Sequence, residues 1–575
     1  MMLDSVKKAF NDSVEAIATS EPLFELEQRE IRGVEFMTFR NGPKTLRDVL
    51  AFCKDHQDAD FIVYENERYS HTDFYRITSL VAQRLIQHYG VKQGDRVALV
   101  MRNCPEYPIL FMALASIGAL AVCLNSWWTS EELEYGFTDS AAKLVFTDAI
   151  QARKLSSFAD RLGLQSVTVR SENAERDPEF WEPIDAVSDV QIPTVDVQPD
   201  DDFAIMYTSG SSGFPKGVVM THRGAISTIQ SWLFGLKVSA RLGWSPAPMI
   251  DKKGKPFQPC SLVTVPFFHV SGTHPGILMS IWLGMKMVIC HKWDPKKAVE
   301  LVEREQVTRF AGVPTMSMEL INAAASMGVT LDSIRNIDAG GASRPADQVG
   351  ILAEAVPHAL IGTGWGMTET NGMGVGLRGE EFIANPGVAG RLQAPLPQIK
   401  IVDEYDQEVP TGEVGELVFK CVSNMRCYLN QPQATADVLR DGWLYTGDMA
   451  SIDDNDLVTI VDRKKEIIIR GGENISCAEV HAALHAHPSV LEAAVFSIPD
   501  ERLGEAVGAC VYLDEGETVS EDELVQAMTP LIARYKLPSK IWFHNERLPR
   551  VGTEKIDKLA LRKKYLDISL DKSDG

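Results

Sequence analysis

Long apolar runs alternate with amphipathic stretches over most of this chain. Between about residues 45 and 420, runs rich in β-branched residues are separated by stretches with helical periodicity, such as PKKAVELVEREQ at 295–306. This alternation is typical of α/β folds whose largely parallel strands are buried on both faces. It predicts strands at RVALVM (96–101), LVFTDA (144–149), LVTVPFF (262–268), KMVICHK (286–292) and KIVDE (400–404).

The pattern changes after about residue 440. Residues 441–475 hold short apolar runs broken by turn residues, and the chain beyond them alternates helical and strand patterns in a compact α+β arrangement. At 575 residues the chain is also too long for one ordinary core. We therefore predict an α/β protein with a large, multi-lobed N-terminal domain of mostly parallel sheets flanked by helices, a small β-barrel-like lobe and a small α+β C-terminal domain.

The charged cluster DRKKE at 462–466 is the preferred boundary between the two domains, which are then 1–464 and 465–575. The longest uncharged stretch, 109–125, falls short of the roughly 20 apolar residues that span a bilayer. It predicts no transmembrane segment, but a buried helix that runs into a buried strand.

Charge and cysteine usage narrow the class of protein. The net charge of -22 disfavours nucleic acid or an anionic membrane as the main partner, because both would repel an acidic surface. Nine cysteines without a CxxC pair favour neither a disulfide framework nor a zinc site. The polar start MMLDSVKKAF carries no signal peptide, so we expect a cytoplasmic protein.

The loop YTSGSSGFPKG at 207–217 is dense in glycines and hydroxyls and carries one lysine. Glycine allows close backbone approach, exposed N–H groups can bind an anion, and the lysine adds a charge for phosphate. We therefore predict that the loop holds a nucleotide triphosphate through Thr208, Ser209, Gly210, Ser211, Ser212, Gly213 and Lys216.

Two alternatives apply to this loop. A Walker A loop is excluded because Pro215 and Gly217 stand where it has Gly and Ser/Thr, and because the following VVM is typical of a strand rather than a helix. A plain Gly/Ser-rich hairpin turn remains open from the residues alone.

The segment GWGMTET at 364–370 offers three groups suited to a nucleotide. Trp365 has a flat face on which adenine could stack, Thr368 has a hydroxyl for a phosphate oxygen, and Glu369 has a hard carboxylate for Mg²⁺. A glycine-rich turn with a packed tryptophan is the structural alternative.

Five motifs in this order resemble the acyl-adenylate-forming superfamily, which comprises acyl-CoA synthetases, beetle luciferases and the adenylation domains of peptide synthetases. They are YTSGSSGFPKG, GWGMTET, YTGD (445–448), DRKKEIIIRGGENI (462–475) and RVGTEKIDK (550–558). The resemblance covers about residues 50–565. It implies that ATP and a carboxylic acid react to an acyl-adenylate and pyrophosphate, and that the acyl group then passes to a thiol.

The resemblance also implies roles for single residues. Asp448 matches the residue that binds the ribose hydroxyls, Arg463 a ribose or phosphate contact, and Lys555 the catalytic lysine that reaches the carboxylate and the α-phosphate. Such a cation stabilises a transition state in which two anions meet. A turn aspartate and two solvated surface cations are the alternatives for these residues considered singly.

The C-terminal domain is mobile in the superfamily and rotates between the two half-reactions. Lys465 matches the hinge residue, and Gly471 and Gly472 would let the pantetheine arm of coenzyme A pass close to the backbone. The loop after GGEN departs from the superfamily at Ser476–Ala478 and His481, which adjoin the path that the resemblance implies for the thiol.

Further matching segments bear on the nucleotide and the acid. The resemblance adds Gly341, Ala342, Ser343, Gly366 and Met367 to the ATP site, and assigns His269, Val313, Gly341 and Gly366 to the acyl pocket. Acetyl-CoA synthetases have tryptophan at the position of Gly366, so a glycine implies an acid larger than propionate. His269 could act near the substrate carboxylate, and it could equally be a packed core histidine.

We therefore predict an ATP-dependent acyl-CoA ligase for a medium- or long-chain fatty acid or a similarly apolar acid, with ATP, Mg²⁺ and coenzyme A as its small-molecule partners and a homodimer as one possible assembly. An aryl or steroid acid as substrate, and a carrier protein as acceptor, are the alternatives from the same fold. A luciferase-like oxygenase and a binding protein that has lost catalysis are the others. The presence of Lys216, Glu369, Asp448 and Lys555 argues against lost catalysis.

Overall fold

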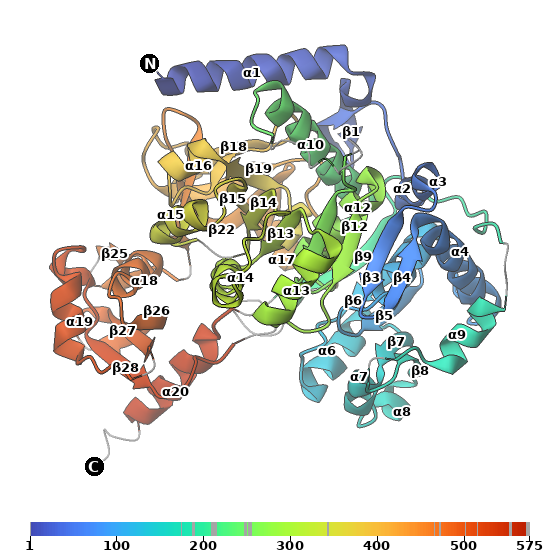
Figure 1. The fold of residues 1–575 in the computed structure, drawn as a ribbon. Helices are drawn as coiled ribbons and strands as arrows, with labels where there is room; N and C mark the ends of the chain where they lie inside the picture. The colour runs from blue at the N-terminus through green and yellow to red at the C-terminus, as the bar shows by residue number, and fades with distance from the viewer. Residues whose placement is uncertain are drawn as a thin grey trace. The chain divides into compact units, whose positions relative to one another are not determined.

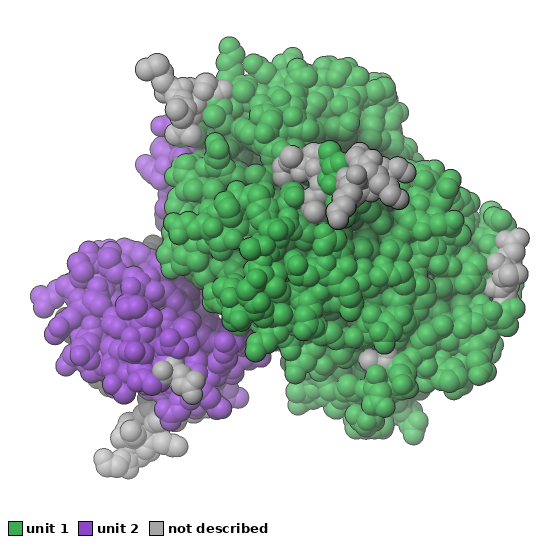
Figure 2. All heavy atoms as spheres, viewed as in Figure 1, with its two compact units in different colours: residues 1–399, 419–444, 455–457 green, residues 400–418, 445–454, 458–575 purple. Residues whose placement is uncertain are grey.

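The structure is a computed structural model of the chain (Figure 1). It describes residues 2–173, 175–186, 190–208, 215–245, 250, 256–341, 344–464, 466–470, 473–500, 502–514, 516–550 and 555–570. Residue contacts divide the chain into two compact units, coloured separately in Figure 2. Unit 1 comprises 1–399, 419–444 and 455–457, and unit 2 comprises 400–418, 445–454 and 458–575.

A seven-stranded sheet in unit 1 carries the segment that leads into the nucleotide loop. Its strands lie in the order β20-β10-β9-β6-β5-β7-β8; the pairs from β9 to β8 are parallel, and β10 is antiparallel to both of its neighbours. The bounds are β5 Arg96–Val100, β6 Leu120–Cys123, β7 Leu144–Asp148, β8 Gln165–Arg170, β9 Asp202–Thr208, β10 Lys216–Thr221 and β20 Cys427–Tyr428.

The strands of a second sheet in unit 1 run in the order β17-β16-β15-β14-β13-β11-β12-β3-β4. From β15 to β3 every neighbouring pair is parallel, and β4, β16 and β17 are antiparallel. The bounds are β3 Asp60–Tyr64, β4 Glu67–Ser70, β11 Cys260–Val263, β12 Lys286–Ile289, β13 Arg309–Gly312, β14 Asn336–Ala339, β15 Leu360–Gly366, β16 Gly374–Arg378 and β17 Gly390–Leu392.

Helices cover both faces of each sheet, which explains why the strands are apolar throughout. In β5, Val97 and Leu99 join the largest core together with α5, while Ala98 and Val100 join a separate core with α6. The second sheet adds β3, β11 and β12 residues to the same largest core, and packs its other face on α13, α14 and α15. Unit 1 is therefore layered as helix, sheet, helix, sheet, helix.

The helices of unit 1 have these bounds: α1 Met2–Ser20, α2 Leu46–Ala51, α3 Cys53–His56, α4 His71–Gln87, α5 Glu106–Ser116, α6 Ser130–Ser140, α7 Ala149–Leu155, α8 Ala159–Leu162, α9 Pro178–Asp185, α10 His222–Arg241, α11 Val270–Gly272, α12 Met279–Leu283, α13 Pro295–Glu305, α14 Pro314–Met327, α15 Ala346–Ala355, α16 Glu380–Ala384 and α17 Pro432–Val438. Short helical turns lie at η1 Pro22–Phe24, η2 Thr273–Leu278 and η3 Thr368–Thr370. A hairpin of β1 Leu26–Ile31 and β2 Val34–Phe39 follows α1.

Unit 2 contains a five-stranded sheet in the order β25-β24-β27-β26, with β28 paired to β27. Helices α18 and α19 cover one face and α20 packs on the other. The bounds are β24 Ile468–Arg470, β25 Glu473–Ile475, β26 Val490–Asp500, β27 Gly504–Leu513, β28 Lys540–His544, α18 Cys477–His485, α19 Glu521–Met528, η4 Arg534–Lys536 and α20 Lys558–Leu570. This is the α+β arrangement predicted for the C-terminal part.

The predicted α/β class is confirmed, with sheets that are mixed rather than wholly parallel. Four of the five predicted strands form over most of their length, but the prediction for 262–268 is largely wrong, because β11 Cys260–Val263 ends at Val263 and a loop follows it. Residues 109–125 form the buried end of α5 followed by buried β6, as expected. Among the described residues, each helix is too short or too polar to cross a bilayer. Strands β18 Gln398–Val402, β19 Gly415–Lys420, β22 Trp443–Ile452 and β23 Leu457–Arg463 are hydrogen-bonded in that order, and β21 Leu439–Arg440 pairs with β22. The small β-barrel-like lobe was predicted without bounds, and it stays a prediction.

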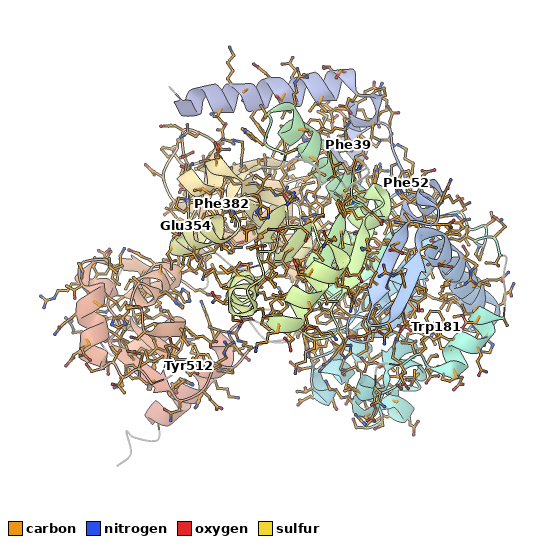
Figure 3. All side chains as sticks on the ribbon, viewed as in Figure 1. Phe39, Phe52, Trp181, Glu354, Phe382 and Tyr512 are labelled. Atoms are coloured by element: carbon orange, nitrogen blue, oxygen red, sulfur yellow. The ribbon has the colours of Figure 1, made fainter. Side chains whose placement is uncertain are left out.

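A cluster of charged side chains is buried at the β8 edge of the seven-stranded sheet. Arg170, at the end of β8, places Nε 2.7 Å from Glu106 Oε2 and Nη2 3.0 Å from Glu67 Oε2. Trp181 of α9, labelled in Figure 3, donates from Nε1 to the other Glu106 oxygen at 2.7 Å. Burial raises the pKa of Glu106, and the Arg170 guanidinium opposes that rise.

We predict that Arg170→Met lowers the free energy of unfolding by about 3–5 kcal/mol, because Glu106 then keeps a buried charge without its cation. Arg153→Met is the matched control, since Arg153 and its partner Glu172 are both exposed; it should change the free energy by less than about 1 kcal/mol. Denaturant unfolding of both variants checks this. Equal losses would show that the buried cluster contributes no more than a surface pair.

Candidate active site

Four parallel strands of the second sheet end at one edge and carry the predicted site loops. The register pairs Val263 with Ala311, Gly312 with Ala339, and Ala339 with Thr363, so that β11, β13, β14 and β15 finish side by side. The segments that follow them hold His269, Val313, Gly341 and Met367–Glu369, and Trp365 and Gly366 are the last two residues of β15. Ligands of α/β sheets bind outside the carboxyl ends of parallel strands, so this edge is the expected place for a site.

Lys216 and Glu369 are brought together by a tyrosine that the sequence analysis did not select. Tyr428 Oη donates to Glu369 Oε1 at 2.8 Å, and Lys216 Nζ lies 4.7 Å from the centroid of the Tyr428 ring. Glu369 is buried, with 6% of its surface exposed. One aromatic residue thus connects the lysine that begins β10 with the carboxylate that follows β15, and no local pattern in CYLNQPQAT would have identified it.

The nucleotide loop leaves β9 at Thr208 and enters β10 at Lys216, which pair in register. A Walker A loop is followed by a helix, whereas this loop is followed by the strand β10. This confirms the part of the prediction that concerned the element after the loop. Thr368 begins the short turn η3, directly before Glu369, and Met367 precedes it. Trp365 lies 6.4 Å from Phe419 between ring centroids, in an edge-on arrangement, and is partly exposed.

The backbone around residue 366 leaves no room for a side chain, which explains the glycine there. Gly366 pairs with Gly374 across β15 and β16, and a Cβ added to Gly366 would lie 2.6 Å from the carbonyl oxygen of Gly372. A side chain here would therefore displace the turn at Gly372, just before β16. The structure supplies a reason for this glycine that does not depend on the size of the acid.

His269 lies in a loop held by tight backbone contacts. A Cβ on Gly272 would meet the Pro266 oxygen at 2.1 Å, and the His269 ring packs on Phe268 with centroids 4.5 Å apart. Asn103, another residue that the sequence analysis missed, donates to the Val265 oxygen and accepts from the Phe267 amide, both at 2.9 Å. This amide fixes the start of the loop.

His274 is hydrogen-bonded to the residue that ends η3. Asn371, which ends η3, donates from Nδ2 to the Ser423 oxygen at 2.6 Å, so its Oδ1 accepts from His274 Nε2 at 3.1 Å. Thr273 Oγ1 lies 3.0 Å from His274 Nδ1. Complete burial lowers the pKa of His274 to about 4, against a weaker opposing effect of Asn371. The histidine is therefore neutral, with its tautomer set by its two neighbours.

Asp448, Arg463 and Lys555 come together in unit 2. Arg463 Nε lies 2.6 Å from the buried Asp448 carboxylate, and the two residues face each other in the β22–β23 register. Lys555 is exposed at the surface, but desolvation by the protein around its ammonium group, followed by repulsion from Arg463, lowers its pKa. Asp448 and Glu466 oppose that shift.

A buried carboxylate anchors the segment that leads to Lys555. Glu492, near the start of β26, accepts from the Leu548 amide at 2.9 Å and pairs with Arg550 Nη2 at 2.6 Å. Arg550 in turn bridges Ile556, the residue after Lys555. Both ends of the loop that carries the lysine are therefore fixed to the body of unit 2.

Ten predicted site residues lie outside the described residues: Ser209, Gly210, Ser211, Ser212, Gly213, Ala342, Ser343, Lys465, Gly471 and Gly472. Of their neighbours, Gly341 adopts a positive φ of 76° and Val313 packs against the core below α14.

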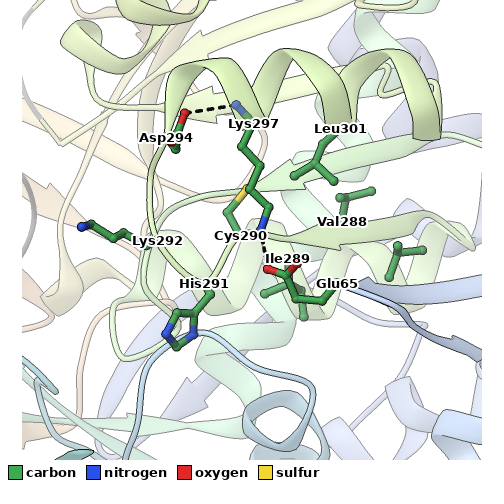
Figure 4. Close-up of a pocket in the computed structure, with 10 residues that line it drawn as sticks. Glu65, Val288, Ile289, Cys290, His291, Lys292, Asp294, Lys297 and Leu301 are labelled. Carbon is green, nitrogen blue, oxygen red and sulfur yellow. Dashed lines mark hydrogen bonds and ion pairs between the residues drawn. The ribbon is translucent and has the colours of Figure 1, made fainter. Parts of the chain in front are cut away.

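A separate, shallow hollow lies at the carboxyl ends of β3 and β12 (Figure 4). Glu65, Cys290, His291 and Lys297 contribute to its lining, and Lys297 Nζ pairs with Glu65 at 2.6 Å. The described residues that line it include none of the predicted site residues, so we do not assign it to the nucleotide or the acid.

Comparison with known proteins places this geometry in a family. The profile of the AMP-binding enzyme family matches residues 50–429, and that of the AMP-binding enzyme C-terminal domain matches 479–555. The chain belongs to the AMP-binding enzyme family. The profiles leave 430–478 unmatched, so the domain boundary at 464/465 stays a prediction.

Curated relatives of this AMP-binding enzyme include acid–CoA ligases. It is 33% identical over 486 residues to the long-chain-fatty-acid–CoA ligase FadD13 of Mycobacterium tuberculosis, which covers 83% of this chain and 89% of the relative. It is 30% identical over 485 residues to 4-coumarate–CoA ligase 1 of Narcissus pseudonarcissus, covering 83% and 85%. The prediction of an AMP-forming acid–thiol ligase is confirmed at the level of this enzyme class.

Solved structures agree with the fold of the AMP-binding enzyme. ATP-bound MatB from Rhodopseudomonas palustris superposes with a TM-score of 0.78 at 26% identity, covering 91% of this chain and 99% of MatB. O-succinylbenzoate CoA synthetase from Bacillus subtilis, in complex with ATP and magnesium, gives 0.73 at 26% identity, covering 90% and 98%.

We predict that Tyr428→Phe weakens the apparent affinity for Mg²⁺ by about 10–100-fold, because a carboxylate that binds metal depends on its hydrogen-bonding partner. The phenylalanine ring keeps the contact with Lys216, so the effect on ATP affinity should be smaller. Titrating Mg²⁺ in a pyrophosphate-exchange assay measures both. Tyr405→Phe, at an exposed tyrosine, is the control; an unchanged Mg²⁺ requirement in Tyr428→Phe would separate Tyr428 from metal binding.

A second prediction concerns pH. The folded pKa of His274, about 4, lies below its usual 6.5, so the neutral ring contributes stability that is present above pH 6.5 and is lost as the pH falls toward 4. That loss amounts to about 3 kcal/mol. His274→Gln retains a donor for Asn371 without a titrating group, and should flatten the fall in melting temperature over this window. His88→Gln, at an exposed histidine, should leave the profile as it is.

Proposed function

We propose that this enzyme activates a carboxylic acid with ATP and then transfers the acyl group to coenzyme A. The observation that carries the proposal is the linked set of Lys216, Tyr428 and Glu369, which joins the nucleotide loop of one sheet to the carboxyl edge of the other. The acid–CoA ligases among its relatives support the choice of acceptor.

In the first half-reaction, a carboxylate oxygen of the acid attacks the α-phosphorus of ATP, and pyrophosphate leaves with the bridging oxygen. Lys216 contributes a cation for the phosphates, and Trp365 a face for adenine. The described residues contain no cluster of three or more metal-binding side chains, which suits Mg²⁺ held by Glu369 together with phosphate oxygens and water. The metal, when bound, neutralises phosphate charge.

The cation that lies between the two reacting anions is Lys555 in this proposal. Asp448 accepts from the ribose hydroxyls, and Arg463, which pairs with Asp448, orients that carboxylate. Preorganised charge of this kind lowers the barrier most where the transition state is most negative.

In the second half-reaction, the sulfur of coenzyme A attacks the acyl carbonyl, AMP leaves, and the thiol proton is lost. We assign Lys465 as the hinge of a mobile C-terminal domain, and Gly471 and Gly472 as the passage for the pantetheine arm. These three assignments rest on the sequence motifs.

For the acid, we propose a molecule larger than propionate with an apolar body, placed between His269, Val313 and the glycine-lined end of β15. A medium- or long-chain fatty acid fits this description, and so does an aryl acid; FadD13 and the 4-coumarate ligases are relatives of both kinds. A carrier protein is the alternative acceptor.

Carboxylate-dependent exchange of labelled pyrophosphate into ATP tests the activation step with a panel of acids. Thioester formation is then followed with coenzyme A and, in parallel, with a carrier protein. If no acid supports exchange above the rate without acid, the proposal is wrong.

We predict that Lys555→Ala slows pyrophosphate exchange by about 10²–10³-fold, the usual cost of removing a charge-stabilising donor. The thiolation half-reaction, started from synthetic acyl-adenylate and coenzyme A, should lose much less. Lys540→Ala, at an exposed lysine of the same unit, is the control. Equal losses in both half-reactions would contradict a role confined to adenylation.

A further inference from the structure

Arg344 is a buried arginine at the same sheet edge as the predicted site. It follows the Gly340–Gly341 segment after β14, and only 3% of its surface is exposed. Its Nη1 donates at 2.9 Å to the hydroxyl of Ser317, in the first turn of α14. Ser317 is itself buried, and its hydroxyl donates a hydrogen bond to the Pro314 oxygen. The same hydroxyl oxygen accepts the hydrogen bond from Arg344, so the partner of this guanidinium is a neutral group.

The opposite edge of the guanidinium, formed by Nε and Nη2, is buried and has no hydrogen-bond partner among the described residues. Desolvation lowers the pKa of Arg344 to about 10, and only Asp338 opposes that shift. Asp338 is already engaged, since Arg378 holds both of its oxygens at 2.8 and 3.2 Å and Arg309 lies 3.3 Å from it. Arg344 therefore lacks a carboxylate of its own in the described part of the chain.

In this protein the Nε–Nη2 edge is one of two edges by which arginines bind carboxylates; Arg391 binds Glu381 through Nη1 and Nη2 instead. Three pairs use the Nε–Nη2 edge, each with Nε on one oxygen and Nη2 on the other: Arg223 with Asp200, Arg378 with Asp338, and Arg426 with Asp202. This geometry matches a planar, bidentate carboxylate. The Nε and Nη2 groups of Arg344, which are buried and have no partner among the described residues, therefore have the geometry to bind a carboxylate in the same way.

We propose that Arg344 binds a second carboxylate on the acid substrate, so that the enzyme prefers dicarboxylic acids with an apolar body. The inference rests on the proposed function and narrows its substrate class. A buried cation is stable only when it is paired, and a ligand that brings its own carboxylate to this edge completes the pair. The neighbouring apolar wall at Val313 and α14 suits the chain between the two carboxylates.

Matched acids of equal length test this directly. Pyrophosphate exchange is measured with hexanoic and hexanedioic, octanoic and octanedioic, and dodecanoic and dodecanedioic acids. The wild-type enzyme should show a higher kcat/KM for the dicarboxylic member of at least one pair. Arg344→Leu should shift the ratio within that pair toward the monocarboxylic acid by a factor on the order of 10² or more, and Arg344→Lys by less, because lysine keeps the charge without the fork.

Arg335→Leu, a partly exposed arginine at the start of β14, is the matched control and should leave the ratio unchanged. The KM values for ATP and coenzyme A show whether Arg344 binds the substrate carboxylate or a phosphate. Both values should stay constant in Arg344→Leu. A selective rise in either value would overturn the assignment. A wild-type preference for every monocarboxylic acid would overturn it without any variant. If no acid of either kind supports exchange, the proposed function itself fails, which is a different result.

Discussion

Parallel pairing of β11, β13, β14 and β15 sets the position of the groups that we assign to the second sheet of unit 1. Because these strands finish in register, four loops from distant parts of the sequence meet at one edge. The glycine pairs of β15 and β16 keep the backbones close there, and Asn103 and His274 hold the adjoining loops by side-chain hydrogen bonds. The apolar cores on both faces of the sheet make this edge rigid, so that small polar contacts can place reactive groups accurately.

Two sets of functional groups are preassembled within separate units. Lys216, Tyr428 and Glu369 are linked in unit 1, while Asp448, Arg463 and Lys555 are gathered in unit 2. Each set has internal contacts that do not depend on the other. The two successive half-reactions that we propose would benefit from such a division, because each set of side chains keeps its own contacts within its unit.

Much of this arrangement could be read from the sequence, because it depends on local patterns. The strands are nearly continuous apolar runs, and the loops around Lys216 and Glu369 stand out by composition, whereas Asp448 and Lys555 were selected only through the resemblance to the superfamily. Tyr428, Asn103, His274 and Glu492 could not be selected in this way, since each acts through partners far away in the chain and sits in an unremarkable stretch. Arg344 was missed for another reason. What distinguishes it is its burial and the lack of a partner for Nε and Nη2 among the described residues, and the sequence GGASRP shows neither. Gly366 was selected, but its backbone contact with Gly372 emerged only in three dimensions.

The link from Glu492 to Arg550 and Leu548 has a mechanical consequence. This carboxylate belongs to β26, which pairs with β27 along nearly its whole length, so the contacts of Glu492 connect the segment before Lys555 to the sheet of unit 2. If the proposed domain rotation takes place, the sheet and the Lys555 ammonium group would turn together. The timing of the chemistry would then be governed by the orientation of a domain.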